Sequence, residues 1–234
     1  MTATRTRLGV VTIGQTPRVD LTPELAPLLP GVTLVERGVL DGCTDEEIAA
    51  FAPAGPGDHA LTTRLRDGRA AIIGEAAVLR RLPAVIAELE RDVDAVLLAC
   101  TGPFPALEHT RPLFVPDRIL AHAVAAFAGD GGTVGVIAPL AEQAEDTTNK
   151  FSRVLGANTR VAVAASSPYT EGAAALRAAA SRLADDGAEV IALDCFGYTA
   201  GMRDVVADAS GLPVVVARSV AARLAAEVLG AGPR

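Results

Sequence analysis

Lysine is almost absent from this sequence: of its 21 lysine and arginine residues, only Lys150 is a lysine. The phosphate-binding motif GxxxxGK[ST] does not occur, which excludes a P-loop kinase. Lys150 lies in DTTNKFSRV, where we expect the middle of a helix and not the end of a strand. It is therefore a poor Schiff-base lysine for a pyridoxal-phosphate enzyme. No G-x-G-x-x-G follows the first predicted strand, so nothing indicates a nucleotide cofactor.

Cysteine and histidine are also scarce, with three residues of each. The cysteines form no C-x-x-C pair and the histidines share no metal-ligand spacing. We therefore expect neither a zinc site nor a disulfide framework. The prediction is that the protein uses no metal and no cofactor, and that its chemistry depends on its own side chains.

The chain has no excess of positive charge and no long apolar segment. Its net charge is −7 and its pI is about 5.0, without a basic stripe, which is atypical of proteins that bind nucleic acid or anionic membranes. Apolar runs such as 95–99 are far too short to cross a bilayer. The N-terminal MTATRTR lacks the apolar core of a signal peptide, so we predict a cytoplasmic location.

Short apolar runs alternate with helical patterns along the whole chain, which is typical of an α/β protein with doubly wound parallel sheets. Strands are expected at 8–13, 32–40, 95–99, 113–115, 133–138, 160–165, 190–194 and 214–217. Helices are expected from an N-cap at Thr22, after a capping box at 44–47, and over 82–91, 119–127 and 141–155. Two more are expected from an N-cap at Ser167 or Thr170 to 186, and over 220–229. A hairpin is predicted around 66–68.

The two halves of the chain resemble each other. The similar pairs are 8–18 with 134–144, 93–102 with 188–197, and 113–127 with 214–228. The first half is longer by about the segment 41–72, which reads as an insertion. We therefore predict two lobes related by a pseudo-twofold axis, with a cleft between them. The first comprises 1–116 and 218–234, and the second comprises 117–217.

Each half places a cysteine just beyond the same predicted strand, and ligands bind at that edge of open parallel sheets. If Cys100 and Cys195 face one cleft, one thiolate can remove a proton from a carbon and the other thiol can return a proton to the opposite face. The alternative is that both are small buried apolar residues. Cys43 lies outside the repeat, and we interpret it as structural.

The chain resembles the AroM family in TIGQTPR (12–18), GVLDGCTDEEIAAFAP (38–53), PDRIL (116–120) and LDCFG (193–197). Through its repeat and its two cysteines it is more distantly similar to the aspartate/glutamate/hydantoin racemase superfamily. This resemblance implies two flavodoxin-like lobes and cofactor-independent proton transfer by a cysteine pair. Single-cysteine members of that superfamily include decarboxylases, and maleate isomerase uses a cysteine nucleophile.

The resemblance also implies where a substrate binds. Gln15, Thr16 and Arg18 lie in the loop where superfamily members bind a substrate carboxylate, although Arg18 could equally be a solvated surface residue. The loops after the cysteines contribute Thr101, Gly102, Gly197, Tyr198 and Thr199. Thr101 could instead cap a helix, and Tyr198 could simply be buried. The loops read Cys-Thr-Gly and Cys-Phe-Gly, not the Cys-Asn-Thr and Cys-Thr of the racemases, so their amino-acid specificity is not carried over.

From these observations we predict a racemase, epimerase or related isomerase that acts on a small carboxylate or carbonyl compound. Substrate oxygens would bind backbone N–H groups near the two glycines, because the developing enolate carries its charge there. One alternative is a single-cysteine decarboxylase or cis–trans isomerase. Another is a non-enzymatic ligand-binding protein. The alanine-rich helices are compatible with a homodimer.

Overall fold

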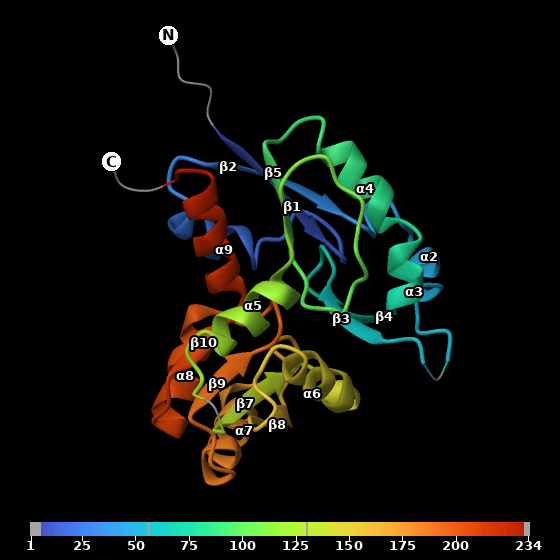
Figure 1. The fold of residues 1–234 in the computed structure, drawn as a ribbon. Coiled ribbons are helices and arrows are strands. Elements are labelled where there is room, and N and C mark those ends of the chain that lie inside the picture. The colour runs from blue at the N-terminus through green and yellow to red at the C-terminus, as the bar shows by residue number, and fades with distance from the viewer. Residues whose placement is uncertain (1–5, 56, 130, 232–234) are drawn as a thin grey trace. The chain divides into compact units, whose positions relative to one another are not determined.

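The computed structural model describes residues 6–55, 57–129 and 131–231. Contacts within the chain divide it into two compact units. Unit 1 contains the chain up to Val115 together with residues from Ala221 onward, and unit 2 is Pro116–Val220. Figure 1 shows that each unit is built on its own sheet. Among the described helices, none is both long enough and apolar enough to span a membrane.

Unit 1 contains a four-stranded parallel sheet in the order β2-β1-β5-β6. Its strands are β1 (Arg7–Thr12), β2 (Thr33–Gly38), β5 (Ala95–Leu98) and β6 (Leu113–Phe114). Its helices are α1 (Thr22–Leu25), η1 (Ala26–Leu28), α2 (Asp45–Ala49), α3 (Glu75–Leu79) and α4 (Leu82–Leu89). The predicted hairpin is present as a separate antiparallel pair, β3 (Ala60–Arg64) and β4 (Ala70–Gly74).

Unit 2 contains the second parallel sheet, in the order β10-β9-β7-β8. Its strands are β7 (Thr133–Ala138), β8 (Arg160–Ala165), β9 (Val190–Leu193) and β10 (Val214–Val216). Its helices are α5 (Pro116–Ala125), η2 (Ala141–Gln143), α6 (Ala144–Ser152), α7 (Ala173–Asp185) and α8 (Ala200–Ser210). The last helix, α9 (Ala217–Val228), begins in unit 2 and ends in the part of the chain assigned to unit 1.

The two sheets have the same topology. Read from the other edge, the second order is β8-β7-β9-β10, so β1, β2, β5 and β6 correspond to β7, β8, β9 and β10. The central pairs end at matching positions, Val11 opposite Leu98 and Ile137 opposite Leu193. Each similar sequence pair therefore includes a matching strand. The predicted α/β fold with two parallel-sheet lobes is confirmed.

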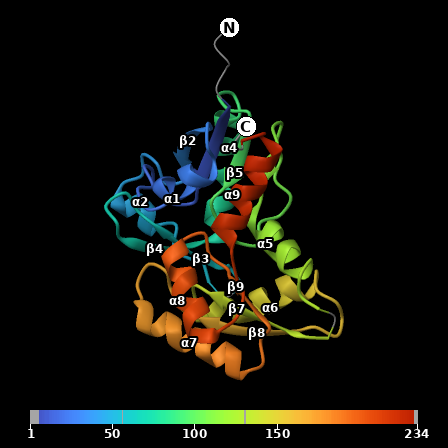
Figure 2. The ribbon, with the colours of Figure 1, turned by 90° about the vertical axis from the view of Figure 1, so that its left-hand side faces the viewer.

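The sheet of unit 2 carries a different apolar core on each face. Side chains from β7, β8 and β9 pack with α7 and α8 in one cluster, which includes Leu193, Cys195 and Tyr198. The alternate residues of β7 and β9 pack with α5 and α6 in the other. Figure 2 shows α7 and α8 on one side of this sheet and α6 on the other. Residues 193 and 195 thus face α7, and the residue between them faces away.

Three details of the helices differ from the predictions. Thr22 does not cap α1, because its hydroxyl donates to Glu36 on the neighbouring strand. Neither Ser167 nor Thr170 caps α7, whose N-cap is Gly172. Helices α3 and α8 lie where no helix was predicted. The capping box at Thr44 is present as predicted, with the Thr44 hydroxyl accepting from the Glu47 N–H.

Candidate functional site

The two predicted cysteines occupy matching positions beyond the central strands. The Ala99 N–H donates to Val11 (2.7 Å) and the Asp194 N–H donates to Ile137 (2.9 Å), so each ladder continues to the residue before the cysteine. Cys100 is 8% exposed and Cys195 is 7% exposed. Both side chains are therefore largely buried, and both lie at the carboxyl edge of a parallel sheet.

Each cysteine sulfur accepts the backbone N–H of the glycine two residues later. The distance is 3.3 Å from Gly102 N to Cys100 Sγ and 3.4 Å from Gly197 N to Cys195 Sγ. An N–H group that donates to sulfur favours the thiolate over the thiol. Each unit thus contains one cysteine whose sulfur accepts the glycine N–H two residues later.

Both glycines are needed because other atoms approach the loops closely. A Cβ at Gly197 would lie 2.6 Å from Tyr169 Cζ, and one at Gly102 would lie 2.8 Å from Leu61 Cδ2. The Tyr169 ring packs on the Cys195 loop, whereas Leu61 of the hairpin strand β3 packs on the Cys100 loop. The two thiol loops are therefore alike in backbone but differ in the side chains that pack on them.

Asp194, which precedes Cys195, faces the other side of the sheet and belongs to a buried ionic cluster. Lys150 Nζ lies 2.6 Å from an Asp194 carboxylate oxygen and 2.9 Å from one of Asp117. Burial alone would lower the pKa of Lys150, but the two carboxylates outweigh it and raise that pKa. Burial raises the pKa of Asp117, which Lys150 only partly offsets. Sequence reasoning missed this cluster, although a lone lysine in a chain rich in arginine was a signal.

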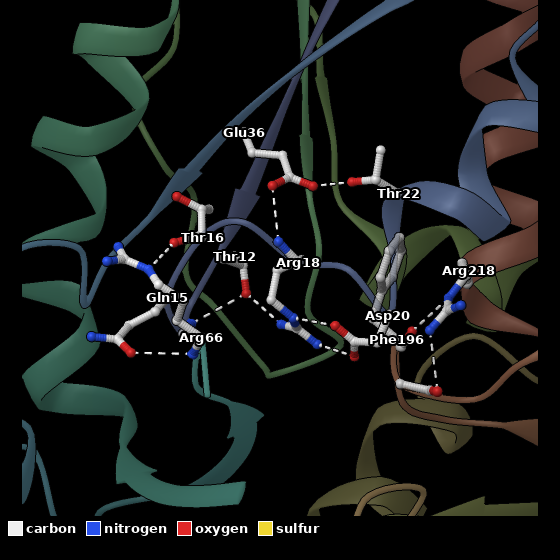
Figure 3. A network of polar contacts seen from close by, with 12 residues as sticks. Thr12, Gln15, Thr16, Arg18, Asp20, Thr22, Glu36, Arg66, Phe196 and Arg218 are labelled. Atoms are coloured by element: carbon white, nitrogen blue, oxygen red, sulfur yellow. Dashed lines mark hydrogen bonds and ion pairs between the residues drawn. The ribbon is translucent and has the colours of Figure 1, made fainter. Parts of the chain in front are cut away.

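Arg218 is a second buried cation close to Cys195. It lies at the start of α9, is 1% exposed, and is among the largest fully buried side chains. Its Nε donates to the Phe196 carbonyl at 2.8 Å (Figure 3). Its Nη2 donates to the Gly197 carbonyl at 3.1 Å. Arg218 therefore holds the loop that follows Cys195.

Arg18, the predicted carboxylate ligand, is bound within unit 1. Its guanidinium makes two parallel bonds of 2.8 Å to the Asp20 carboxylate, and its Nη1 donates to Thr12 Oγ1 at 2.7 Å (Figure 3). Burial would raise the pKa of Asp20, but the hydrogen bonds and charge of Arg18 lower it. Arg18 is 3% exposed. These contacts suit a residue that shapes the loop after β1, and they leave little of the guanidinium for a substrate.

Gln15 and Thr16 are also tied to neighbouring segments. Asp41 accepts the Thr16 N–H (2.7 Å) and the Thr16 hydroxyl (2.6 Å). Arg66, in the turn of the hairpin, donates from Nε to the Thr16 carbonyl (2.5 Å) and from its backbone to the Gln15 side chain (3.2 Å), as Figure 3 shows. The predicted insertion thus braces the predicted substrate loop.

Tyr198 and Thr199 contribute to a cavity of about 290 Å³ within unit 2. The Tyr198 hydroxyl donates to the Ser166 carbonyl, and burial raises the pKa of Tyr198 well above its ordinary value. Thr199 caps α8 by accepting the Met202 N–H at 3.1 Å. The remaining walls are largely apolar, with Pro168, Leu176, Met202 and Val205 among the lining residues. Both predicted residues therefore line a cavity while holding local structure.

Three further observations concern Thr101, metal binding and Cys43. Thr101 is half-buried and no helix follows it before α5, so it does not cap a helix as one reading suggested. Over residues 6–55, 57–129 and 131–231, no group of three or more His, Cys, Asp or Glu side chains is placed to hold a metal ion. Cys43, interpreted as structural, receives a hydrogen bond of 2.6 Å from Arg81 Nη1.

A family model described as AroM protein matches residues 8–229. The chain belongs to the AroM family. No curated protein matches this AroM family chain. The resemblance predicted from the sequence motifs is confirmed.

Solved structures with a similar fold include a decarboxylase, a racemase and an isomerase. Unliganded arylmalonate decarboxylase is 13% identical, with a TM-score of 0.60 over 98% of this chain and 94% of that one. Allantoin racemase from Klebsiella pneumoniae is 17% identical (TM-score 0.59, coverage 98% and 90%). The maleate isomerase Iso from Pseudomonas putida S16 is 13% identical (TM-score 0.61, coverage 96% and 93%). At these identities the similarity shows that the AroM family chain shares their fold.

Proposed function

We propose that this AroM family protein is a cofactor-independent racemase or epimerase of a small carboxylate or carbonyl compound, with Cys100 and Cys195 as acid and base. The observation that supports this most strongly is the matched pair of thiol loops, each with Sγ on the glycine N–H two residues later. A cysteine that only filled space would not need a hydrogen-bonded glycine loop at the ligand-binding edge of each sheet.

The reaction needs only proton transfer. One cysteine thiolate takes the proton from the substrate carbon, and the electron pair left behind moves into the adjacent carbonyl to form an enolate. The other cysteine, as a thiol, gives its proton to the opposite face of that carbon. The first sulfur then carries the proton and the second is the thiolate, so the roles exchange in the reverse direction. The proposal requires both thiols to reach one carbon from opposite faces.

Substrate oxygens would be bound by Thr101 and by backbone N–H groups near Gly102 and Gly197, since preorganised donors stabilise an enolate most. Arg18 is better suited to positioning the β1 loop, because its guanidinium already binds Asp20 and Thr12. Similarly, Thr16 is bound to Asp41 and Tyr198 to Ser166. These residues would shape the site and would not bind the reacting group.

Deuterium exchange tests the proposal. The protein is incubated in deuterated water with amino acids, hydantoins and aromatic-pathway acids, and each compound is followed by NMR and chiral chromatography. For a true substrate we expect early deuterium in the product enantiomer but not in the recovered starting enantiomer, because the returned proton comes from a second thiol.

Serine variants identify the two bases. Cys100→Ser and Cys195→Ser should each lower the isomerisation rate by about 10²-fold or more, and Cys43→Ser should leave it unchanged. Loss of turnover in only one of the first two variants would indicate single-thiol chemistry and would favour the alternative of a single-cysteine decarboxylase or cis–trans isomerase. If no compound exchanges its proton and both serine variants still bind a ligand with unchanged affinity, the protein is a ligand-binding protein and not an isomerase.

A further inference from the structure

The peptide group between Phe196 and Gly197 connects Arg218 to the Cys195 sulfur. Its carbonyl oxygen accepts from Arg218 Nε at 2.8 Å, and its N–H donates to Cys195 Sγ at 3.4 Å. A charged donor on the carbonyl polarises the peptide and makes its N–H a stronger donor. Arg218 therefore acts on the sulfur through one peptide group.

A second bond fixes the orientation of this peptide. Arg218 Nη2 donates to the Gly197 carbonyl at 3.1 Å, so the planar guanidinium holds two successive carbonyls of the loop. The guanidinium also lies 5.9 Å from the centre of the Phe196 ring. Because Arg218 is 1% exposed, it cannot rotate into water without breaking this arrangement.

In the sequence repeat, Arg218 aligns with Asp117, but the two residues make different contacts. Asp117 lies near the start of α5, as Arg218 lies near the start of α9, but Asp117 contacts Lys150, which in turn contacts Asp194. The residues before and after Cys195 are thus each held by a buried cation. This means that the Cys195 loop is fixed by charged contacts on both of its sides.

We propose that Arg218 is the positioning residue of the Cys195 thiol: it aims the Gly197 N–H at Sγ and favours the thiolate there. The other charged or titratable groups around this loop are Tyr169, Tyr198 and Glu171 on the Cys195 side of the sheet and Asp194, Lys150 and Asp117 on the opposite side. The catalytic consequence rests on the proposed function, but the effect on the thiol does not.

Site-resolved alkylation tests this without a substrate. Wild-type protein, Arg218→Met, Arg218→Lys and the exposed control Arg223→Met are treated with iodoacetamide between about pH 6 and 9, a range that spans thiol titration. Peptide mass spectrometry then gives a separate rate for Cys100 and for Cys195. Cys100 in the same molecule is the internal reference.

For Arg218→Met we expect alkylation of Cys195 to be about tenfold slower at pH 7, with its pH profile shifted upward and that of Cys100 unchanged. Arg218→Lys, which keeps the charge, should fall between this variant and the wild type. Equal profiles for all four proteins would overturn the proposal. So would faster alkylation of both cysteines, because general loosening of the fold exposes buried thiols. If Arg218→Met fails to fold, Arg218→Lys decides alone by the same criteria.

The alkylation result and the exchange result are independent. A shifted Cys195 profile in a protein that exchanges no substrate proton would support the role of Arg218 and refute the isomerase. If the Cys195 alkylation profile is unshifted in Arg218→Met and Cys195→Ser loses substrate exchange, the role of Arg218 is refuted and the isomerase is supported.

Discussion

Replacing Lys150 by methionine tests the reading of the buried ionic cluster. Lys150 Nζ lies within 2.9 Å of carboxylate oxygens of both Asp117 and Asp194, and the three side chains are 13%, 14% and 4% exposed. The variant leaves two carboxylates buried without their cation, which typically costs about 3–5 kcal/mol. Since domains of this kind are stable by only about 5–15 kcal/mol, Lys150→Met should lose a large part of its folding free energy at neutral pH.

The loss should depend on pH in a definite direction. Burial already raises the pKa of Asp117 above its ordinary value of 3.8, and removal of Lys150 raises it further. A carboxyl whose pKa is higher in the folded state favours folding fully below its ordinary value and loses that contribution as the pH rises through the folded value. The deficit of Lys150→Met relative to wild type should therefore be smallest near pH 4 and grow toward neutrality.

Urea unfolding followed by circular dichroism measures the deficit at several pH values. Arg153→Met, an exposed substitution at the end of the same helix, should leave stability unchanged. The triple variant Asp117→Asn, Lys150→Met, Asp194→Asn should recover much of the loss, because no unpaired charge remains. A deficit below about 1 kcal/mol, or one that is the same at every pH, would refute the reasoning.

Two further variants probe the loops beside the sheets. Gly197→Ala should destabilise the protein by about 1–3 kcal/mol, since the new methyl would lie 2.6 Å from the Tyr169 ring and force it to move; an unchanged urea midpoint would contradict this packing. Glu90→Gln should cost about 2 kcal/mol at pH 7. Burial would raise the pKa of Glu90, but N–H and hydroxyl donors from Arg111 and Thr110 lower it. Its contribution is therefore present above the ordinary value of 4.5 and lost at lower pH, and a stability difference that persists in acid would contradict this origin.

The strands of the two parallel sheets were predictable because they are short apolar runs that alternate with longer helical patterns. Helix boundaries were harder. Thr22 has the sequence of an N-cap, but its hydroxyl finds the carboxylate of Glu36, 14 residues away. Helix α8 was overlooked, although Thr199 at its N-cap and Gly211 in the left-handed conformation at its end are ordinary helix signals. Its weak apolar periodicity hid it.

The candidate site could be predicted from the sequence where it repeats, and not where it depends on tertiary contacts. The repeat located Cys100 and Cys195, and with them Gly102 and Gly197. Lys150 pairs with Asp117, which is 33 positions earlier in the chain, and with Asp194, which is 44 positions later. No local sequence pattern encodes such distant pairs. Arg18 was expected to be available to a substrate, and its bond to Asp20 shows that a nearby acid can satisfy it first.

The hairpin of unit 1 has a consequence for how this family could diversify. It is a self-paired ribbon whose strands join neither parallel sheet, yet its turn residue Arg66 holds the loop that contains Gln15 and Thr16. Changes in the length or composition of this ribbon would therefore alter how the loop after β1 is held, while the strands that lead to the cysteines stay unchanged. The loop after β1 and the two cysteine loops can therefore vary independently of each other within the family.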